Sequence, residues 1–109
     1  MYIHLHHEGS IRTRFVFLTF SILIQSGTVV WDVSVVGWEV VYGEEFVPSQ
    51  EGGYTVIIQK TKKVLSSEEP IRNSFKATEP GKVVLTIDNN SRRKKLAVYR
   101  YIIKKEEAF

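Results

Sequence analysis

Four consecutive cations at positions 92–95 are the residues of this chain whose types and spacing most clearly suggest chemistry. They follow Asn89, Asn90 and Ser91, residue types that favour a turn, so we expect them where the chain leaves an exposed loop. Guanidinium and ammonium groups bind phosphate and carboxylate groups. With three further lysines, they form a predicted binding site for anionic lipids or an acidic partner: Arg92, Arg93, Lys94, Lys95, Lys60, Lys62 and Lys63.

The charge is divided unevenly between the two halves of the chain. The net charge is only +3, but residues 1–59 contain two arginines and six acids, whereas residues 60–109 contain thirteen cations and six acids. This asymmetry favours an anionic partner for the second half, with nucleic acid and a phospholipid surface as candidates. A solvated basic face that maintains solubility is the alternative.

Metal binding is not favoured, although three histidines lie close together. His4, His6 and His7 are the only histidines and have the close spacing of metal ligands, but Glu8 is the only further ligand type nearby. We expect this segment to be a mobile terminus with weak, adventitious metal affinity. The chain has no cysteine, which excludes disulfides, cysteine zinc sites and a thiol nucleophile. We predict no metal site and no cofactor.

Catalysis is not favoured either. There is no G-x-S-x-G motif and no glycine-rich phosphate loop, and the acids Glu44-Glu45 and Glu68-Glu69 are adjacent pairs that we expect in loops. Asp32 lies on the polar face of a predicted strand, but the sequence assigns it no partner. The sequence therefore predicts a binding protein and not an enzyme.

Residues 15–24 form an uncharged, apolar segment that has two interpretations. Arg12 and Arg14 precede it, as basic residues precede the apolar region of a secretory signal, and this alternative would place the chain in the secretory pathway. The segment is too short to span a bilayer, and the residues after it lack a typical cleavage site. Its apolar residues also alternate with period two, which favours a buried strand.

The rest of the chain reads as a series of strands separated by turns. Runs of alternating or β-branched residues recur at roughly 8 to 12 residue spacing, the pattern of an all-β sandwich. We predict an antiparallel β-sandwich of about seven or eight strands. The predicted strands are residues 29–36, 38–42, 54–60 and 71–78, followed by a β-hairpin at 80–105. A turn or bulge is expected at Gly43, Glu44 and Glu45, and loops at 48–53 and 61–70.

Most of the aromatic residues are expected in the core of this sandwich. Bases of a nucleic acid would need aromatic and basic side chains on the same face of a strand. Tyr99 and Tyr101 share one face of their predicted strand and Arg100 takes the other, so nucleic-acid binding is not favoured. The expected core aromatics are Trp31, Trp38, Tyr54, Phe75, Tyr99 and Tyr101.

An ordered set of motifs resembles a known domain. The motifs are SGTVVWDV from Ser26, GWEVVYGEEFVP from Gly37, YTVIIQK from Tyr54, NSFK from Asn73, and GKVVLTIDN with KKLAVYRY from Gly81. Together they resemble the C-terminal GOLD (Golgi dynamics) domain of the plant patellins, over about three quarters of the chain. We assign residues 26–105 to a GOLD-like domain, 1–25 to an atypical N-terminal segment with a His-rich start, and 106–109 to a C-terminal tail.

The resemblance implies a function as well as a fold. In patellins, the GOLD domain follows a CRAL-TRIO lipid-transfer domain, and the proteins bind phosphoinositides and act in membrane trafficking. It implies a cytoplasmic, peripherally membrane-associated module that binds proteins and contacts anionic membranes weakly. The cations at 92–95, with those at 60–63, are the expected contact. An acidic protein partner or nucleic acid, without lipid contact, is the alternative.

Overall fold

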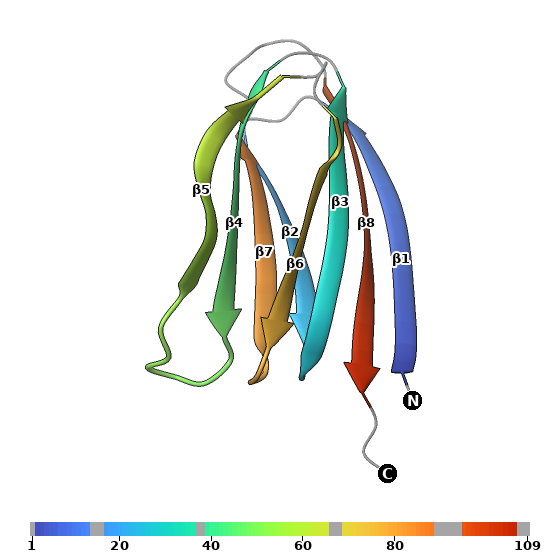
Figure 1. The fold of residues 1–109 in the computed structure, drawn as a ribbon. Helices are drawn as coiled ribbons and strands as arrows, with labels where there is room; N and C mark the ends of the chain where they lie inside the picture. Colours follow the sequence, from blue (N-terminus) through green and yellow to red (C-terminus); the bar gives the residue numbers. More distant parts are fainter. Residues whose placement is uncertain (1, 14–16, 37–38, 66–68, 89–94, 107–109) are drawn as a thin grey trace.

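The structure, a computed structural model, is an all-β sandwich (Figure 1). It describes residues 2–13, 17–36, 39–65, 69–88 and 95–106, and the side chains of residues 19–35, 39–65, 69–88 and 99–104. The described residues form eight strands: β1 (Tyr2–Thr13), β2 (Phe17–Ile24), β3 (Gly27–Val36), β4 (Val40–Pro48), β5 (Val56–Val64), β6 (Ile71–Ala77), β7 (Gly81–Asp88) and β8 (Lys95–Glu106). The predicted fold class, an antiparallel β-sandwich, is confirmed.

The strands form two sheets of four strands each. Sheet I has the order β1-β8-β3-β6, and sheet II has the order β2-β7-β4-β5. All strand pairs are antiparallel, and β1, β6, β2 and β5 form the sheet edges. No helix long and apolar enough to cross a membrane is present in the described part of the chain.

The predicted hairpin at 80–105 is wrong in its pairing, although both of its strands are present. Strand β7 pairs with β2 and β4 in sheet II, whereas β8 pairs with β1 and β3 in sheet I (Figure 1). A strand has only two edges, and both edges of β7 are occupied. The chain therefore passes from one sheet to the other between Asp88 and Lys95.

The N-terminal segment also differs from its prediction as a mobile terminus. Residues Tyr2–Thr13 form β1, which pairs with β8 along its whole length, from Tyr2 opposite Glu106 to Thr13 opposite Lys95. The strand predicted in residues 15–24 is present as β2, where Phe20, Ile22 and Ile24 are buried and Thr19 and Ser21 are exposed. The period-two interpretation of β2 is confirmed.

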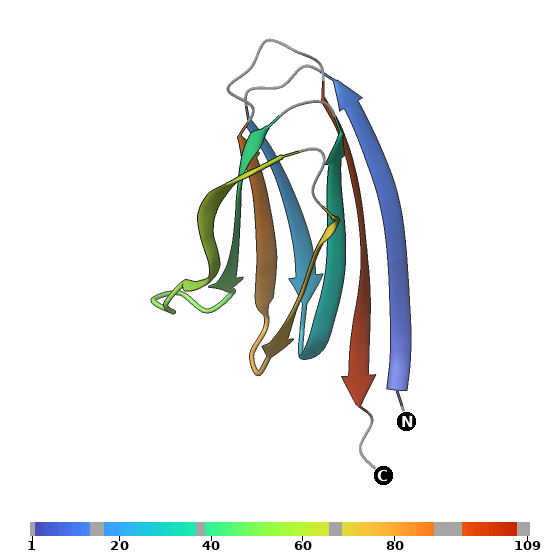
Figure 2. The ribbon, with the colours of Figure 1, turned by 45° about the horizontal axis from the view of Figure 1, so that its top comes forward.

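The predictions for β4 and β5 have different outcomes. Strand β4 continues through Gly43, Glu44 and Glu45, and its pairing with β5 shifts register there, so the expected turn or bulge is present as a bulge. Strand β5 extends through Thr61 to Val64, where a loop was predicted. Because β5 is an edge strand, its polar residues face solvent and need no apolar partner. The bulges bend β5 strongly (Figure 2).

The core lies between the sheets and consists of inward-facing residues of every strand whose side chains are described. Trp31 and Tyr42 are its largest fully buried side chains, and the Phe46 ring stacks on Phe75 with 4.8 Å between centroids. Gly81, at the start of β7, lies so close to Phe46 that an added Cβ would be 2.5 Å from the ring. The buried apolar cluster comprises Phe20, Ile22, Ile24, Val29, Trp31, Val33, Val35, Val40, Tyr42, Phe46, Val64, Ala77, Val83, Leu85, Ile87 and Ile103.

Candidate functional site: two basic surfaces and a buried carboxylate

The predicted anion-binding residues that the structure describes lie on an edge strand. Lys60, Lys62 and Lys63 are on β5 in sheet II, and all three are exposed. None of them forms an ion pair with a described carboxylate. Lys95 begins β8 in sheet I, and its side chain is outside the described set. Arg92, Arg93 and Lys94 lie outside the described residues, so a single site formed by both groups remains a prediction.

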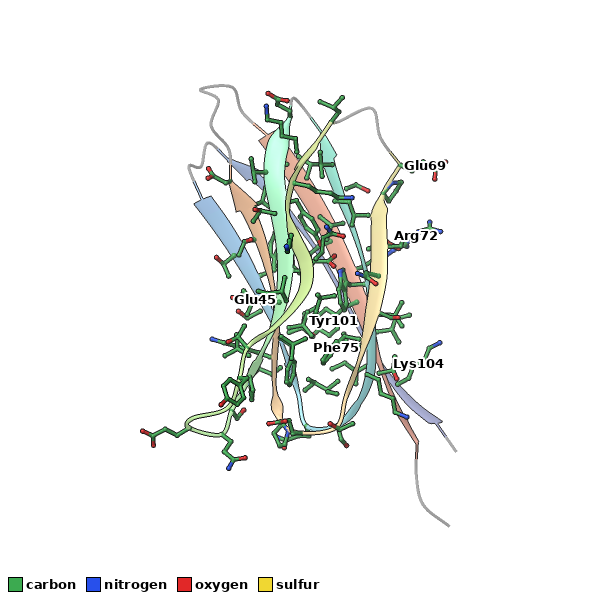
Figure 3. The ribbon with its side chains drawn as sticks, turned by 60° about the vertical axis from the view of Figure 1, so that its left-hand side comes forward. Glu45, Glu69, Arg72, Phe75, Tyr101 and Lys104 are labelled. Carbon is green, nitrogen blue, oxygen red and sulfur yellow. The ribbon has the colours of Figure 1, made fainter. Side chains whose placement is uncertain are left out.

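A second basic surface, which the sequence interpretation missed, lies on the outer face of sheet I. Two cations of β6 and two of β8 flank the central strand β3 in matching register. Arg72 and Arg100 both lie opposite Asp32, and Lys76 and Lys104 both lie opposite Thr28. All four cations are exposed, and Figure 3 shows Arg72 and Lys104 pointing away from the sandwich on the same side. We call Arg72, Lys76, Arg100 and Lys104 the sheet I cation group.

The spacing of this group follows from sheet geometry. Two neighbouring strands are about 4.8 Å apart, so the backbones of β6 and β8, which carry these cations, are separated by about 10 Å across β3. Four residues along a strand span about 13 Å, which is the separation of Arg72 from Lys76 and of Arg100 from Lys104. Uncharged side chains of β3 lie between them, including Thr28 and Val30. The group is therefore a broad, flat array and not a pocket around one anion.

Asp32 is the acid within this array, and it has two partners. Its Oδ2 accepts a hydrogen bond from Arg100 Nε at 3.0 Å and lies 3.7 Å from Arg72 Nε. The side chain of Asp32 is 19% exposed. It holds two guanidinium groups close to the surface of the sheet, and it offsets one of the four positive charges. The sequence placed Asp32 correctly on the polar face of its strand but identified neither partner.

A buried carboxylate joins the two sheets. Glu44, on β4 in sheet II, is only 3% exposed. Its Oε2 accepts hydrogen bonds from Trp31 Nε1 at 2.9 Å and from the Tyr42 hydroxyl at 2.6 Å, and its Oε1 accepts one from Asn73 Nδ2 at 2.7 Å. Trp31 and Asn73 belong to sheet I, on β3 and β6. We call these four residues the Glu44 network.

Both carboxylate oxygens of Glu44 accept hydrogen bonds within the Glu44 network, and no cation among the described side chains forms an ion pair with it. Charge-assisted hydrogen bonds of this kind are the usual compensation for burying an acid. The same environment acts on Tyr42: burial raises the pKa of its hydroxyl far above the ordinary value, and the hydrogen bond to Glu44 and the nearby carboxylate charge raise it further. Tyr42 is therefore a neutral hydrogen-bond donor at all ordinary pH values.

A sequence signal for the Glu44 network existed. Val40, Tyr42, Glu44 and Phe46 alternate with period two and share the inward face of β4. The prediction that the adjacent pair Glu44-Glu45 lies in a loop is wrong, because apolar alternation continues on both sides of it. Glu45 lies outside the core on the opposite face, as Figure 3 shows. Glu68 of the other predicted pair lies outside the described residues, and Glu69 is exposed.

A cavity of about 420 Å³ lies beside β5 on the outer face of sheet II. Its floor includes Gly43, where an added Cβ would lie 3.0 Å from Thr61 Cγ2 and 3.3 Å from Thr86 Oγ1. The absence of a side chain at Gly43 therefore keeps this space open. The lining residues are Gly43, Glu44, Glu45, Ile57, Gln59, Lys60, Thr61 and Thr86.

The aromatic predictions are largely confirmed. Tyr99 and Tyr101 pack against the core, and the Tyr99 ring lies 4.1 Å from Phe20, whereas Arg100 faces outward. These tyrosines are therefore not exposed platforms for bases. Tyr54, predicted in the core, is 90% exposed, so that prediction is wrong. Trp38 lies outside the described residues.

No group of three or more His, Cys, Asp or Glu side chains is placed to hold a metal ion among the side chains that the structure describes. The side chains of His4, His6 and His7 are not among these, although their backbone belongs to β1. The interpretation of their metal affinity stays a prediction.

The fold, with its two four-stranded antiparallel sheets, defines a β-sandwich module of the GOLD type. The family model described as "Patellin-1-like, C-terminal GOLD domain" matches residues 16–95. The chain belongs to this family of patellin C-terminal GOLD domains, which are non-catalytic modules. Strand β1 and most of β8 lie outside the matched range.

Similar proteins from Arabidopsis thaliana support the same assignment. Patellin-4 is 60% identical over 82 residues, which cover 75% of this chain and 15% of patellin-4. Patellin-5 is 48% identical over 84 residues, covering 76% of this chain and 13% of that protein. Patellin-3 has the same identity over 84 residues, covering 17% of its length. The chain thus spans less than a fifth of each of these relatives.

Proposed function

We propose that this chain is a non-catalytic GOLD module that contacts anionic membranes, including those containing phosphoinositides, through weak electrostatic attraction, and that it assists membrane trafficking in this way. The observation that carries the proposal is the sheet I cation group. Its four exposed cations share one sheet face, on which Asp32 is the one acid among the side chains that the structure describes. A flat basic face fits a membrane surface better than it fits a small anion, which requires converging donors.

The magnitude of the attraction limits the role of this face. Each cation near an anionic leaflet contributes about 1 kcal/mol, and the net charge of the group with Asp32 is about three positive charges, so the face supplies about 3 kcal/mol. A dissociation constant of 1 mM corresponds to about 4 kcal/mol, so the face alone binds more weakly than that. Stable recruitment requires a second membrane contact that acts together with it. The cations at 92–95 and 60–63 are candidates for part of this contact.

Co-sedimentation with vesicles tests the proposal. The chain is mixed with neutral phosphatidylcholine vesicles, with vesicles containing phosphatidylserine, and with vesicles containing a phosphoinositide. We expect binding only to the anionic vesicles, with a steep decrease between about 50 and 300 mM salt, because screening shortens the Debye length. Equal binding to neutral and anionic vesicles, or no binding at low salt, would refute the proposal.

Three variants measure how much each basic group contributes to binding of anionic vesicles. Lys76→Ala with Lys104→Ala removes half of the sheet I cation group and leaves the Asp32 ion pairs intact. We expect it to reduce binding to anionic vesicles about tenfold or more, since two charges are lost. Matched variants replace either the three β5 lysines or the cations at 92–95 by alanine. Unchanged binding after the 92–95 replacement would remove that segment from the membrane contact.

An acidic protein partner is the second candidate function. Strand β5 favours it, because this edge strand carries exposed lysines next to exposed apolar side chains. Nucleic-acid binding is not proposed, because Tyr99 and Tyr101 are turned toward the core. Retardation of labelled RNA or DNA by the chain at low salt would contradict this exclusion.

A further inference from the structure

Strand β5 has an unusual concentration of exposed apolar side chains. Five large apolar residues are exposed in the described part of the chain, and four of them lie on β5 or directly beside it. Ile57 is 57% exposed, and Tyr54 is 90% exposed. Three of the four lie at or just before the start of β5, and Leu65 follows its end. Exposed apolar side chains that gather on one element often mark an interaction surface. The four residues are Tyr54, Val56, Ile57 and Leu65.

The backbone of β5 is also available on one side. Strand β5 is the last strand of sheet II, and its neighbour is β4. In an antiparallel sheet, alternate residues direct their N–H and C=O groups toward opposite neighbours, so outside its two bulges half of these groups on β5 point away from β4. An extended segment of another chain can pair with them as an added strand.

The positive charge on β5 indicates which kind of peptide segment can pair with it. Lys60, Lys62 and Lys63 are exposed and form no ion pair with a described carboxylate. Lysines on an edge strand oppose pairing with a second copy of the same strand, because like charges would lie opposite one another. The same lysines favour a strand that carries acidic side chains. A second copy of this chain is therefore a poor partner, and an acidic segment is a good one.

The cavity beside β5 adds a place for an apolar side chain. Ile57 and Thr61 of β5 form one wall, and Gly43 forms part of the floor. A strand added to β5 lies about 4.8 Å from it, so a side chain on the outer face of the added strand can contact Ile57 or Thr61, which form this wall. In strand addition, backbone hydrogen bonds provide affinity, and pockets for alternate side chains provide specificity.

From these features we infer that β5 is a docking strand for an extended, acidic segment of a protein partner, which adds to sheet II and packs an aliphatic or aromatic side chain against Ile57 at the edge of the cavity over Gly43. This site is separate from the sheet I cation group, which belongs to the other sheet. The inference does not depend on membrane contact, and either one can fail without the other.

A designed peptide provides the probe, and the complete chain is used throughout. The peptide is EVEVELEVE, labelled with a fluorophore, and binding is measured by fluorescence anisotropy. Two further versions are methylated on the backbone nitrogens of alternate residues, one version for each frame. Each version blocks one hydrogen-bonding edge of the peptide and leaves charge and side chains unchanged. Strand addition predicts that one version loses affinity roughly tenfold or more, whereas the other binds like the unmodified peptide.

Matched charge variants locate the contact. Replacing Lys60, Lys62 and Lys63 by glutamate is expected to weaken peptide binding roughly tenfold or more. The control is Lys76→Glu with Lys82→Glu and Lys104→Glu, which changes the net charge equally at exposed positions away from β5. We expect this control to bind the peptide within about threefold of the unaltered chain, because screening weakens distant charges.

Changes in amide chemical shifts in NMR spectra of the isotope-labelled chain locate the peptide on the unaltered protein, so this measurement does not depend on whether a variant folds. The inference predicts peptide-induced shifts along β5 and at Gly43 and Thr86. Absence of peptide binding would overturn it. It would also be overturned if the two methylated versions bound with equal affinity, or if the two charge variants lost equal affinity. The same holds if β5 amides shifted with anionic vesicles but not with the peptide.

Discussion

Replacement of Glu44 is the most demanding test of how the sandwich is held together. The Glu44→Ala variant removes the acceptor of three hydrogen bonds, two buried at 2.9 and 2.6 Å and one partly buried at 2.7 Å, and leaves the donors of Trp31, Tyr42 and Asn73 without this partner. Each unsatisfied buried donor costs about 1–3 kcal/mol, and relaxation or entering water reduces the sum. We expect a loss of about 3–5 kcal/mol in the free energy of unfolding.

The Glu44→Gln variant separates the hydrogen bonds from the charge. The amide oxygen still accepts from Trp31 and Tyr42, but the amide nitrogen then faces the amide nitrogen of Asn73. Asn73 cannot easily reverse its amide, because its Oδ1 accepts a hydrogen bond from the backbone N–H of Ser74 at 2.8 Å. We therefore expect an intermediate loss of about 1–2 kcal/mol.

Urea unfolding, followed by circular dichroism, measures both variants. The slope of the free energy against urea is checked first, because a changed slope would indicate an altered unfolded or native state. Glu45→Gln is the matched control, since Glu45 is adjacent in sequence but lies on the opposite face; we expect a change within about 0.5 kcal/mol. If Glu44→Ala stays within about 1 kcal/mol of the unaltered chain, the Glu44 network does not hold the sheets together.

Three further changes test other parts of the structure. In the unaltered chain, the pKa of the native Tyr42 hydroxyl is raised, so above pH 10 only the unfolded chain releases this proton. The free energy of unfolding therefore falls by about 1.4 kcal/mol per pH unit there because of this group. Tyr42→Phe removes this contribution and should make stability fall less steeply above pH 10. An alkaline limb identical to that of the unaltered chain would contradict this. Gly81→Ala should lower the free energy of unfolding by about 1–3 kcal/mol, because its Cβ would lie 2.5 Å from the Phe46 ring, and an unchanged urea midpoint would contradict this close packing. Asp32→Asn should change stability by less than about 1 kcal/mol but strengthen sedimentation with anionic vesicles about fivefold, and weaker sedimentation would argue against the sheet I cation group.

The sequence predicted the elements of this fold better than their pairing. Period-two alternation identified β2, β3 and β7, because each has one fully buried apolar face and a second face that is on average more polar or less buried. It could not show that β7 and β8 belong to different sheets, since alternation specifies which face is buried and not which strands are neighbours. The polar end of β5 was predicted as a loop for a related reason: at an edge, both faces of a strand can be solvated.

Of the candidate sites, the sequence likewise predicted some and missed others. Lys60, Lys62 and Lys63 were recognised as a cluster because they are close in sequence. The sheet I cation group was missed, because Arg72 and Arg100 are brought together only by the register of β6 and β8 on β3. Glu44 was missed although its alternation with Tyr42 was visible, since an acid next to another acid suggests a loop. Long-range pairing, which sequence spacing does not encode, accounts for the first omission, whereas the second came from the local pattern of two adjacent acids.

An NMR titration of the isotope-labelled chain with lipid nanodiscs tests the proposed membrane contact most directly. With nanodiscs containing phosphatidylserine and a phosphoinositide, we predict that amide signals broaden on β3, β6 and β8, with the strongest effects near Arg72, Lys76, Arg100 and Lys104. Neutral nanodiscs should leave these signals unchanged. Equal broadening with neutral nanodiscs, or effects confined to sheet II, would contradict the proposal that the outer face of sheet I contacts anionic membranes.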